Sequence, residues 1–372
     1  MFKYFKHAGI IAGAALLLSA CGGGAGSHAP GAVPQSVDGA QRAIHTVGAQ
    51  TRYTPPISTV NDAANLGQFA GGFDGNMYFA EEQSATNCTT CSGRISKITT
   101  SGSITSYTLQ QFTDDNNVSH PVRPYALMTT SDSKVWFVSK DGYFGSINTD
   151  GSSPTVYSLH SLGSDASGTF DAITQGTDGN FYLAESTPDR VIKVTSGGTP
   201  SVFCSSFSSG ADLGMIFLNG DANFWLTERG TGKIAKLTSG GTLTEYNATS
   251  GGGYDPFDMA TDGSNLWYTA QAVSPSTGTL LVEMKNDGTI LHSYTITTAP
   301  AGEGAIALQG VSYAWVINAN ISRVRQSTGV VNDYTLTNSD PNTVAGGMIP
   351  GTDGNFWFTD RAHNKIVKVS KT

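Results

Sequence analysis

Asp178-Gly179-Asn180-Phe181-Tyr182 is one copy of a motif that recurs along the chain. An Asp-Gly pair is typical of a tight hairpin turn because both residues tolerate positive φ angles, and the aromatic residues that follow favour a buried strand. An apolar strand precedes each turn and an alternating strand follows the aromatic one, so each copy lies inside a unit of several strands. The aromatic residues that anchor the seven copies are Tyr78, Trp136, Tyr182, Trp225, Trp267, Trp315 and Trp357.

The spacing of these anchors indicates the architecture. Neighbouring anchors are 42 to 58 residues apart, which is near the length of one four-stranded propeller blade. No segment shows a 3.6-residue apolar period over helical length. We therefore predict an all-β protein folded as a seven-bladed β-propeller.

The two ends of the repeat array predict how the ring closes. The last repeat stops after its third strand, residues 365–369, and lacks an outer strand. Residues 50–55, upstream of the first repeat, have the pattern of that missing strand. Because an open ring leaves unpaired strand edges, we expect residues 50–372 to form one domain in which the N-terminal strand completes the last blade.

Residues 1–20 have the features of a lipoprotein signal peptide. Lys3 and Lys6 precede an apolar run at residues 8–18 that is too short to span a bilayer. The run leads through Leu-Ser-Ala to Cys21, which resembles a bacterial lipobox and implies cleavage before Cys21 and acylation of that residue. Several acyl chains on one residue anchor a protein stably. We therefore expect a lipid-anchored protein of the bacterial cell envelope, and Gly22 resembles the sorting pattern of the outer membrane.

Residues 21–49 are interpreted as the lipidated cysteine and a flexible tether, since Gly, Ala, Ser and Pro dominate this segment. The whole chain has 21 basic and 29 acidic residues and a net charge of −8, which becomes −10 when Lys3 and Lys6 leave with the signal peptide. This balance argues against nucleic acid and anionic lipid as electrostatic partners. We expect a monomer that contacts the membrane through its lipid anchor.

The clearest repeat reads Asn-Phe-Trp-Leu-Thr-Glu at residues 223–228, Gly-Lys-Ile-Ala-Lys-Leu at 232–237 and Leu-Thr-Glu-Tyr at 243–246, and residues 355–366 repeat its first parts. These motifs resemble the virginiamycin B lyase (streptogramin lyase) family over about residues 50–372. The resemblance implies a seven-bladed propeller. For lyase members it also implies that a cyclic depsipeptide lactone is opened by elimination, with histidines and a magnesium ion held by glutamates on one face.

The catalytic residues of that family do not carry over to this sequence. The family histidines open the first strand of a blade, and that frame holds Tyr125 here. Where the lyases have a metal-binding Glu, four residues after the last anchor, this chain has Arg361, whose cation does not bind magnesium. Elimination needs a base and an electrophile, so we assign no catalytic residue and do not expect the family reaction. The residues at the first-strand position, counted back from each anchor, are Gly67, Tyr125, Asp171, Gly214, Phe257, Gly304 and Gly346.

A second set of positions, three residues after each anchor, is rich in carboxylates and is expected near the channel mouth. Four of these seven residues are acidic. One interpretation is a site for a divalent cation, Mg²⁺ or Ca²⁺, or for a basic or polar ligand. The other is that the carboxylates cap loop amides as part of the repeat. The full candidate ligand-binding set is Glu81, Arg123, Tyr125, Glu185, Glu228, Asp360 and Arg361.

Two further features concern loops. The widest anchor spacing contains an acidic run at residues 114–117, which lacks EF-hand spacing and is interpreted as a solvated loop. Cys88 and Cys91 share one loop and are expected to form a local disulfide in an oxidising compartment. Cys204 follows an apolar strand and is expected to be a small buried side chain.

Two classes of function stay open. A propeller without a complete catalytic set favours a binding module for a protein, a glycan or a small molecule. The alternative is a divergent metal-dependent lyase or lactonase whose site lies on the propeller face.

Overall fold

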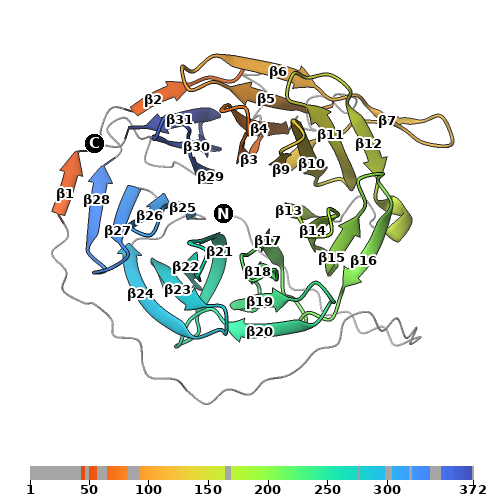
Figure 1. Ribbon diagram of the computed structural model, residues 1–372. Helices are drawn as coiled ribbons and strands as arrows, with labels where there is room; N and C mark the ends of the chain where they lie inside the picture. The colour runs from red at the N-terminus through yellow and green to blue at the C-terminus, as the bar shows by residue number, and fades with distance from the viewer. Residues whose placement is uncertain are drawn as a thin grey trace.

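The structure, a computed structural model, describes residues 43–46, 50–56, 65–82, 92–163, 169–274, 276–297, 304–317, 321–335 and 345–370. Seven sheets surround a central axis, so the predicted seven-bladed β-propeller is confirmed (Figure 1). The helical structure in this part of the chain is a single 3-10 turn, η1 (His160–Leu162). None of it is long and apolar enough to cross a membrane.

Blades 1 to 5 are four-stranded antiparallel sheets in chain order, with the first strand of each nearest the axis. Blade 1 contains β3 (Asn65–Gly71), β4 (Met77–Glu82), β5 (Arg94–Ile98) and β6 (Ile104–Thr108). Blade 2 contains β9 (Pro124–Thr130), β10 (Lys134–Ser139), β11 (Tyr143–Asn148) and β12 (Thr155–Ser158). Blade 3 contains β13 (Phe170–Gln175), β14 (Phe181–Ser186), β15 (Asp189–Val194) and β16 (Pro200–Cys204). Blade 4 contains β17 (Leu213–Leu218), β18 (Phe224–Glu228), β19 (Lys233–Leu237) and β20 (Leu243–Asn247). Blade 5 contains β21 (Tyr254–Thr261), β22 (Asn265–Ala272), β23 (Thr279–Lys285) and β24 (Ile290–Thr297). A small hairpin between blades 1 and 2 contains β7 (Phe112–Thr113) and β8 (Ser119–His120).

Blade 7 is closed by the N-terminal strand, as predicted. Its strands are β29 (Ala345–Pro350), β30 (Phe356–Asp360), β31 (Lys365–Val369) and β2 (Gln50–Tyr53). β2 pairs antiparallel with β31, and the ring of Tyr53 stacks on that of Trp357 with centroids 5.5 Å apart. The N-terminal and C-terminal segments thus share one sheet, which removes the open edge that an incomplete last blade would leave.

Blade 6 has a fifth strand that the sequence analysis did not predict. Its strands are β25 (Ala305–Gln309), β26 (Tyr313–Ile317), β27 (Ile321–Arg325), β28 (Val331–Thr335) and β1 (Ala43–Thr46). β1 runs parallel to β28, with Ala43 opposite Asn332. Residues 43–46 were expected to belong to the tether, so sheet structure begins at residue 43 rather than 50. The outer edge of β28 offers unpaired N–H and C=O groups, and an extended segment passing along the ring satisfies them.

The hydrophobic core lies between the blades. Each of the seven clusters of buried side chains draws its members from two neighbouring blades, including the last and the first. Because apolar burial is the main stabilising contribution to folding, each blade depends on both neighbours.

The recurring turn is stabilised by hydrogen bonds to the carboxylate of its aspartate. The carboxylate of Asp353 accepts hydrogen bonds from the Asn355 amide at 3.1 Å and from Trp357 Nε1 at 3.1 Å, and it lies 2.7 Å from Lys368 Nζ. Gly354 takes a positive φ of 78° in this turn. The same bond from the anchor aromatic to the turn carboxylate recurs at Asp74, Asp178, Asp221 and Asp262.

Buried threonine hydroxyls connect three pairs of neighbouring blades. Thr269 Oγ1 donates to the main-chain oxygen of Gly304 at 2.7 Å, and Thr227 and Thr359 make the corresponding contacts to Phe257 and Gly67 at 3.3 Å and 3.4 Å. These threonines occupy the second position after the anchor aromatic. They are almost completely buried, so each hydroxyl finds its acceptor in a main-chain carbonyl of the neighbouring blade.

Candidate functional site

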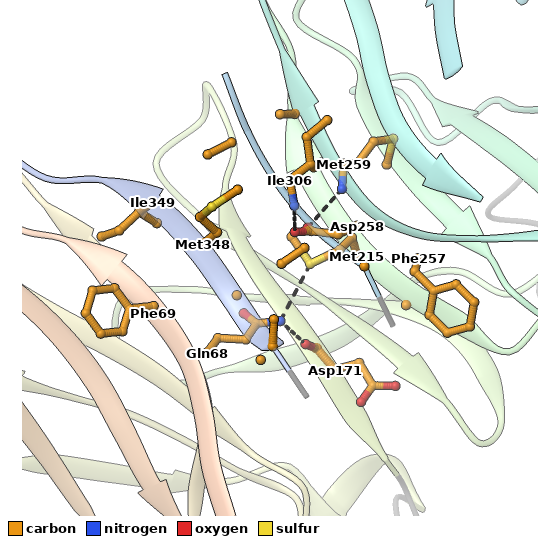
Figure 2. Close-up of a pocket in the computed structure, with 18 of the residues that line it drawn as sticks. Gln68, Phe69, Asp171, Met215, Phe257, Asp258, Met259, Ile306, Met348 and Ile349 are labelled. Carbon is orange, nitrogen blue, oxygen red and sulfur yellow. Dashed lines mark hydrogen bonds between the residues drawn. The ribbon is translucent and has the colours of Figure 1, made fainter. Parts of the chain in front are cut away.

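A cavity of about 400 Å³ lies on the axis of the ring, lined by residues of the innermost strands (Figure 2). Its wall includes six of the seven first-strand positions that the sequence analysis had counted back from the anchors. These six residues are Tyr125, Asp171, Gly214, Phe257, Gly304 and Gly346.

Irregular strand pairing occurs at five of these six positions, the exception being Gly304, which directly precedes the regular ladder of β25 with β26. The ladder between β9 and β10 skips Tyr125, and the ladder between β13 and β14 skips Asp171. In four other blades the register shift leaves two residues without a partner. Bulges of this kind redirect side chains and occur next to functional sites. The unpaired positions are Gly67–Gln68 in β3, Gly214–Met215 in β17, Phe257–Asp258 in β21 and Gly346–Gly347 in β29.

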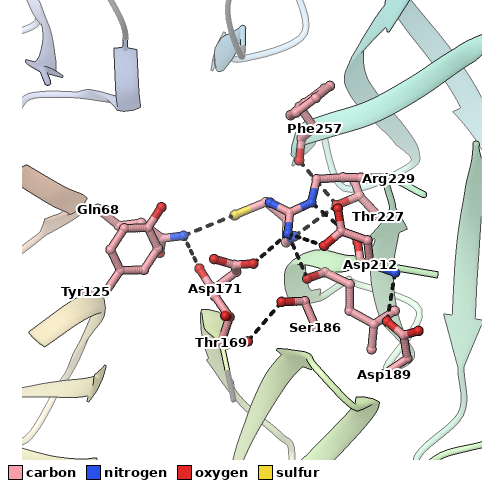
Figure 3. A network of polar contacts seen from close by, with 12 residues as sticks. Gln68, Tyr125, Thr169, Asp171, Ser186, Asp189, Asp212, Thr227, Arg229 and Phe257 are labelled. Carbon is pink, nitrogen blue, oxygen red and sulfur yellow. Dashed lines mark hydrogen bonds and ion pairs between the residues drawn. The ribbon is translucent and has the colours of Figure 1, made fainter. Parts of the chain in front are cut away.

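One wall of the cavity carries a three-residue charge network (Figure 3). Arg229 Nη2 donates to Asp171 Oδ2 at 2.6 Å and to Asp212 Oδ1 at 2.8 Å. Gln68 Nε2 reaches from blade 1 to the main-chain oxygen of Asp171 at 2.6 Å. Burial raises the pKa of Asp171, and the charge of Arg229 acts against that rise. The network holds the Asp171 carboxylate at the cavity surface in a fixed orientation.

Arg361 and Tyr125 form a second polar pair in the cavity wall. Arg361 Nη2 donates to Tyr125 Oη at 2.7 Å, and Arg361 Nε donates to the main-chain oxygen of Leu66 at 3.0 Å. Lys140 Nζ lies 3.8 Å from the centroid of the Tyr125 ring, which is the geometry of a cation–π contact. Glycine at 346 makes room for this arrangement, because a Cβ there would come within 2.4 Å of Arg361 Nε.

Most of the remaining wall is apolar, but Asp258 and Thr261 also line it. Met215, Met259 and Met348 line the cavity with Phe69 and Ile306 (Figure 2). Methionine side chains are flexible and polarisable and adapt to differently shaped apolar groups. The cavity therefore combines an adaptable apolar surface with fixed polar groups, which include the Asp258 carboxylate that accepts hydrogen bonds from the amides of Ile306 and Met259 at 2.9 Å.

The four candidate carboxylates do not line this cavity. Each is completely buried in its own blade. Glu81 accepts from Ser96 and Ser106, Glu185 pairs with Arg190, Glu228 accepts from Thr231, and Asp360 contacts His363 and Arg52. These contacts are to side chains rather than to loop amides, so the capping of loop amides by these carboxylates stays a prediction. The described residues include no cluster of three or more His, Cys, Asp or Glu side chains placed to hold a metal ion.

Glu228 has a strongly perturbed carboxyl group. Burial raises its pKa to about 8, and the neighbouring Glu245 adds to the effect. Glu245 is held by Lys233 Nζ at 2.7 Å and by the Ser208 amide at 2.7 Å. The raised pKa reflects burial beside a like charge within blade 4.

The remaining candidates lie outside the cavity. Arg123 Nη1 lies 3.2 Å from Asp141 Oδ2 at the edge of blade 2. In the acidic loop, Asp114 Oδ1 accepts hydrogen bonds from the amides of Asn116 and Val118, so the turn itself occupies this oxygen.

Cys21, Cys88 and Cys91 lie outside the described residues. Cys204 is buried as expected, but it takes part in a disulfide whose partner also lies outside the described residues. The chain has four cysteines. A lipidated Cys21 together with a Cys88–Cys91 disulfide would therefore leave Cys204 without a cysteine to bond.

The sequence analysis missed Arg229, Gln68 and Met215 as cavity residues. A signal for Arg229 was present, because Glu228-Arg229 and Asp360-Arg361 stand at equivalent positions of two repeats. Gln68 and Met215 carry no such signal, since they enter the cavity only through the two-residue register shifts.

Solved structures with the same fold include several propellers. A streptogramin B lyase structure is 21% identical, with coverage of 87% of this chain and 98% of that chain and a TM-score of 0.68. A catalytically inactive virginiamycin B lyase from Staphylococcus aureus, solved with quinupristin, is 20% identical, with coverage of 87% and 99% and a TM-score of 0.66. YCF48 bound to the D1 peptide is 9% identical, with coverage of 89% and 100% and a TM-score of 0.62. At these identities the likeness establishes the fold alone.

The family is established by sequence. No curated protein matches the chain. The model of the virginiamycin B lyase family, however, matches residues 112–372, which is most of the propeller. With the seven blades and the axial cavity described above, this match shows that the chain belongs to the virginiamycin B lyase family.

Proposed function

We propose that this protein is a cell-envelope lipoprotein whose propeller binds a ligand in the axial cavity without carrying out the elimination reaction of lyase members. One observation carries the proposal. The cavity wall presents Tyr125 and Asp171 at first-strand positions and Arg361 at the position of the metal-binding Glu, and no histidine is among its described residues. These groups bind and orient a ligand, whereas the family reaction depends on histidines and a metal ion.

The dimensions and chemistry of the cavity support binding. A volume of about 400 Å³ lies in the range of small-molecule sites, which combine mainly apolar walls with a few fixed polar groups. Proteins of the same fold hold quinupristin in one case and the D1 peptide in another. A protein segment or a small molecule is therefore the class of ligand to test first.

The envelope location rests on the N-terminal sequence. Acylation of Cys21 would attach the propeller to the membrane, most simply the outer membrane, through a tether ending near β1. The acidic net charge supports a monomer that does not bind nucleic acid.

The experiment compares ligand binding in two variants. Met215→Trp fills the cavity from its apolar wall, whereas Val202→Trp places the same side chain on the exposed β16. Small-molecule and peptide fractions of an envelope extract should raise the melting temperature of the wild type and of Val202→Trp, but not of Met215→Trp. Equal shifts in both variants would contradict a cavity site, and efficient opening of quinupristin by the purified protein would contradict a non-catalytic role.

A divergent lyase or lactonase is the second candidate. One observation favours it, because burial raises the pKa of Asp171 at the position that opens the first strand, where the lyases have their histidine. An enzyme of this kind would lose turnover in Asp171→Asn, and a metal-dependent one would lose it in EDTA. A binding module has no turnover for either treatment to remove.

A further inference from the structure

In three blades, the residue opposite the anchor aromatic is a lysine that pairs with the turn carboxylate. In blade 7, Lys368 lies opposite Trp357 in the strand ladder, and its Nζ atom lies 2.7 Å from Asp353 Oδ2. The corresponding ion pairs of blades 3 and 4 are Lys193–Asp178 at 2.7 Å and Lys236–Asp221 at 3.2 Å. In these blades the repeat therefore places a cation at this position and neutralises it within the blade.

Blade 6 keeps the cation but not the carboxylate. Arg323 lies opposite the anchor Trp315. The position four residues before the anchor, which is Asp353 in blade 7, holds Val311 here, and the Val311 side chain is 73% exposed. Trp315 Nε1 donates instead to the neutral side chain of Gln309 at 3.1 Å. The turn of blade 6 thus offers Arg323 no negative charge.

Aromatic rings hold the Arg323 guanidinium in place. Its Cζ atom lies 4.7 Å from the ring centroid of Tyr313 and 5.4 Å from those of Trp315 and Tyr334. Cation–π contacts of this kind orient the guanidinium but leave its charge without a counter-ion. Its Nε atom is buried without a hydrogen-bond partner. Within the described part of the chain, Arg323 makes no ion pair and no side-chain hydrogen bond.

A second arginine, Arg325, lies on the same face of β27. Alternate residues of a strand project to the same side, and their Cα atoms are about 7 Å apart. Arg325 is exposed and lies opposite Tyr313 in the ladder, and no described residue pairs with its guanidinium. The carboxylate of the neighbouring strand, Asp333, is on the other face, where it accepts from Ser322 Oγ at 2.7 Å. Two positive charges therefore lie side by side without a carboxylate from the strands around them.

Two guanidinium groups at this spacing favour a phosphate group as ligand. Guanidinium groups bind oxyanions through parallel hydrogen bonds and are more weakly hydrated than an ammonium group. A phosphate monoester carries a charge of about −1.5 to −2 at neutral pH and has three acceptor oxygens, enough for both arginines, whereas a carboxylate brings one negative charge. The net charge of −8 does not prevent binding, because charges more than about 8 Å away are largely screened at physiological salt.

From this placement we propose that Arg323 and Arg325 form a binding site for a phosphate group on blade 6. The axial cavity is lined by other residues, so this site goes beyond the proposed function. A soluble phosphomonoester and a lipid headgroup both present the same group. The lipid source is worth testing because β1 adds to this blade (Figure 1), with Ala43 opposite Asn332 and Asn332 opposite Arg323, so an acylated tether would enter the blade beside the site.

The test restores the carboxylate that blade 6 lacks. Val311→Asp places it where Asp353 stands in blade 7 and should neutralise Arg323, whereas Val311→Asn has the same shape without the charge. Isothermal titration calorimetry of the full-length protein with inorganic phosphate and with phenyl phosphate, at low ionic strength, measures binding. Wild type and Val311→Asn should bind both ligands. Val311→Asp, Arg323→Gln and Arg325→Gln should each bind about 10-fold or more weakly, because charge-assisted contacts are lost.

Lys368→Gln is the matched control for loss of a cation. It removes the lysine at the equivalent position of blade 7, which Asp353 already neutralises, and should leave phosphate binding unchanged. No binding by the wild type, equal affinities of Val311→Asp and Val311→Asn, or a loss in Lys368→Gln as large as in Arg323→Gln would overturn the site.

Vesicles identify the source of the phosphate. Phosphatidylcholine vesicles with and without phosphatidylglycerol are sedimented with protein carrying Cys21→Ser, so that a lipid anchor does not contribute. Sedimentation that needs phosphatidylglycerol and is lost in Val311→Asp would support the site and assign it to a lipid headgroup. Binding of phenyl phosphate without sedimentation would support the site and assign it to a soluble monoester.

Discussion

Arg52 Nη1 lies 3.7 Å from Asp360 Oδ2, so an ion pair joins the N-terminal strand β2 to the second strand of the last blade. Asp360 is completely buried, and His363 Nδ1 contacts the same carboxylate oxygen at 2.8 Å. The closing strand therefore contributes a charged partner to a buried group as well as its main-chain hydrogen bonds. Removing a partner from a buried charge costs more than losing an exposed ion pair.

Truncation of the N-terminus should show a graded loss of stability. A chain beginning at residue 43 keeps β1 and β2 and should melt like the full mature protein. A chain beginning at residue 50 loses β1, whose parallel pairing with β28 is at an outer edge, and should lose about 1–3 kcal/mol of unfolding free energy because each main-chain hydrogen bond contributes about 1 kcal/mol. A chain beginning at residue 57 loses β2 and should fail to fold or should associate. Chemical denaturation and light scattering measure these differences. Equal stability for the chains beginning at 43 and 57 would contradict closure by β2.

The buried threonines should stabilise the contact between blades. Thr227→Val, Thr269→Val and Thr359→Val each remove a hydrogen bond between a buried hydroxyl and a carbonyl of the neighbouring blade and should cost about 1–3 kcal/mol of unfolding free energy. Thr242→Val changes the same atoms at an exposed residue and serves as the control. Urea denaturation of the four variants measures the effect, and no difference between the buried and the exposed sites would refute it.

The turn carboxylates should make the protein sensitive to acid. Burial opposes ionisation of Asp353, but hydrogen bonds from Lys368, Asn355 and Trp357 outweigh it and lower its pKa to about 2. A carboxyl group whose pKa is lowered by folding stabilises the protein above the unfolded pKa near 4, and that contribution is lost as the pH falls to about 2. Asp353→Asn should therefore reduce the unfolding free energy by about 2 kcal/mol at pH 7 and have little effect at pH 2. A cost that is the same at both pH values would show that the charge of Asp353 is not what stabilises the turn.

Glu228 should have the opposite pH dependence. Its pKa is raised to about 8 by burial and by Glu245, so its contribution is fully present below the unfolded pKa near 4.5 and is lost as the pH rises through 8. Glu228→Gln keeps a side chain that can accept from Thr231 and donate to Glu245. This variant should match the wild type at pH 4.5 and exceed it by about 1–4 kcal/mol at pH 8.5. Glu245→Gln is the contrasting change, because it weakens the pair with Lys233 and should destabilise the protein. Parallel pH profiles of wild type and Glu228→Gln would argue against a buried neutral Glu228.

The cysteines allow a sharp test of the anchor. Cys21→Ser should release the protein from membranes into the soluble fraction, since acylation needs that residue. If Cys21 is acylated, the disulfide of Cys204 must use Cys88 or Cys91, because the chain has no other cysteine. Peptide mapping without reduction identifies the bond. A Cys21–Cys204 peptide, or a Cys21→Ser variant that stays in the membrane fraction after a high-salt wash, would rule out the lipid anchor.

The blades could be predicted from the sequence because each repeat contains the turn and strand residues that specify its own hairpin. The turn at Asp353 and the aromatic at Trp357 specify a hairpin and a buried strand without reference to distant residues. Counting back from the anchors also identified positions that line the cavity, among them Tyr125 and Asp171.

Contacts between repeats could not be read in the same way. Arg229 binds Asp171, 58 residues away and in another blade, and nothing in either repeat specifies that pairing.

The positions of the candidate carboxylates follow from the alternation of side chains between the two faces of a strand. Glu228 lies two residues after Leu226, which is buried between blades 3 and 4, so its side chain points into the blade packing rather than into the cavity.

The pairing of β2 with β31 also fixes an order of events during biogenesis. β2 is synthesised before any of the blades, but its partner β31 is the last strand of the last blade, with Gln50 opposite Val369. Contacts between residues so distant in sequence form slowly, because the entropic cost of closing the long intervening loop comes before the contacts stabilise the chain. The last blade cannot be completed until residues 365–369 have been synthesised. The ring therefore closes only after β31 has been synthesised, however early the first blades form.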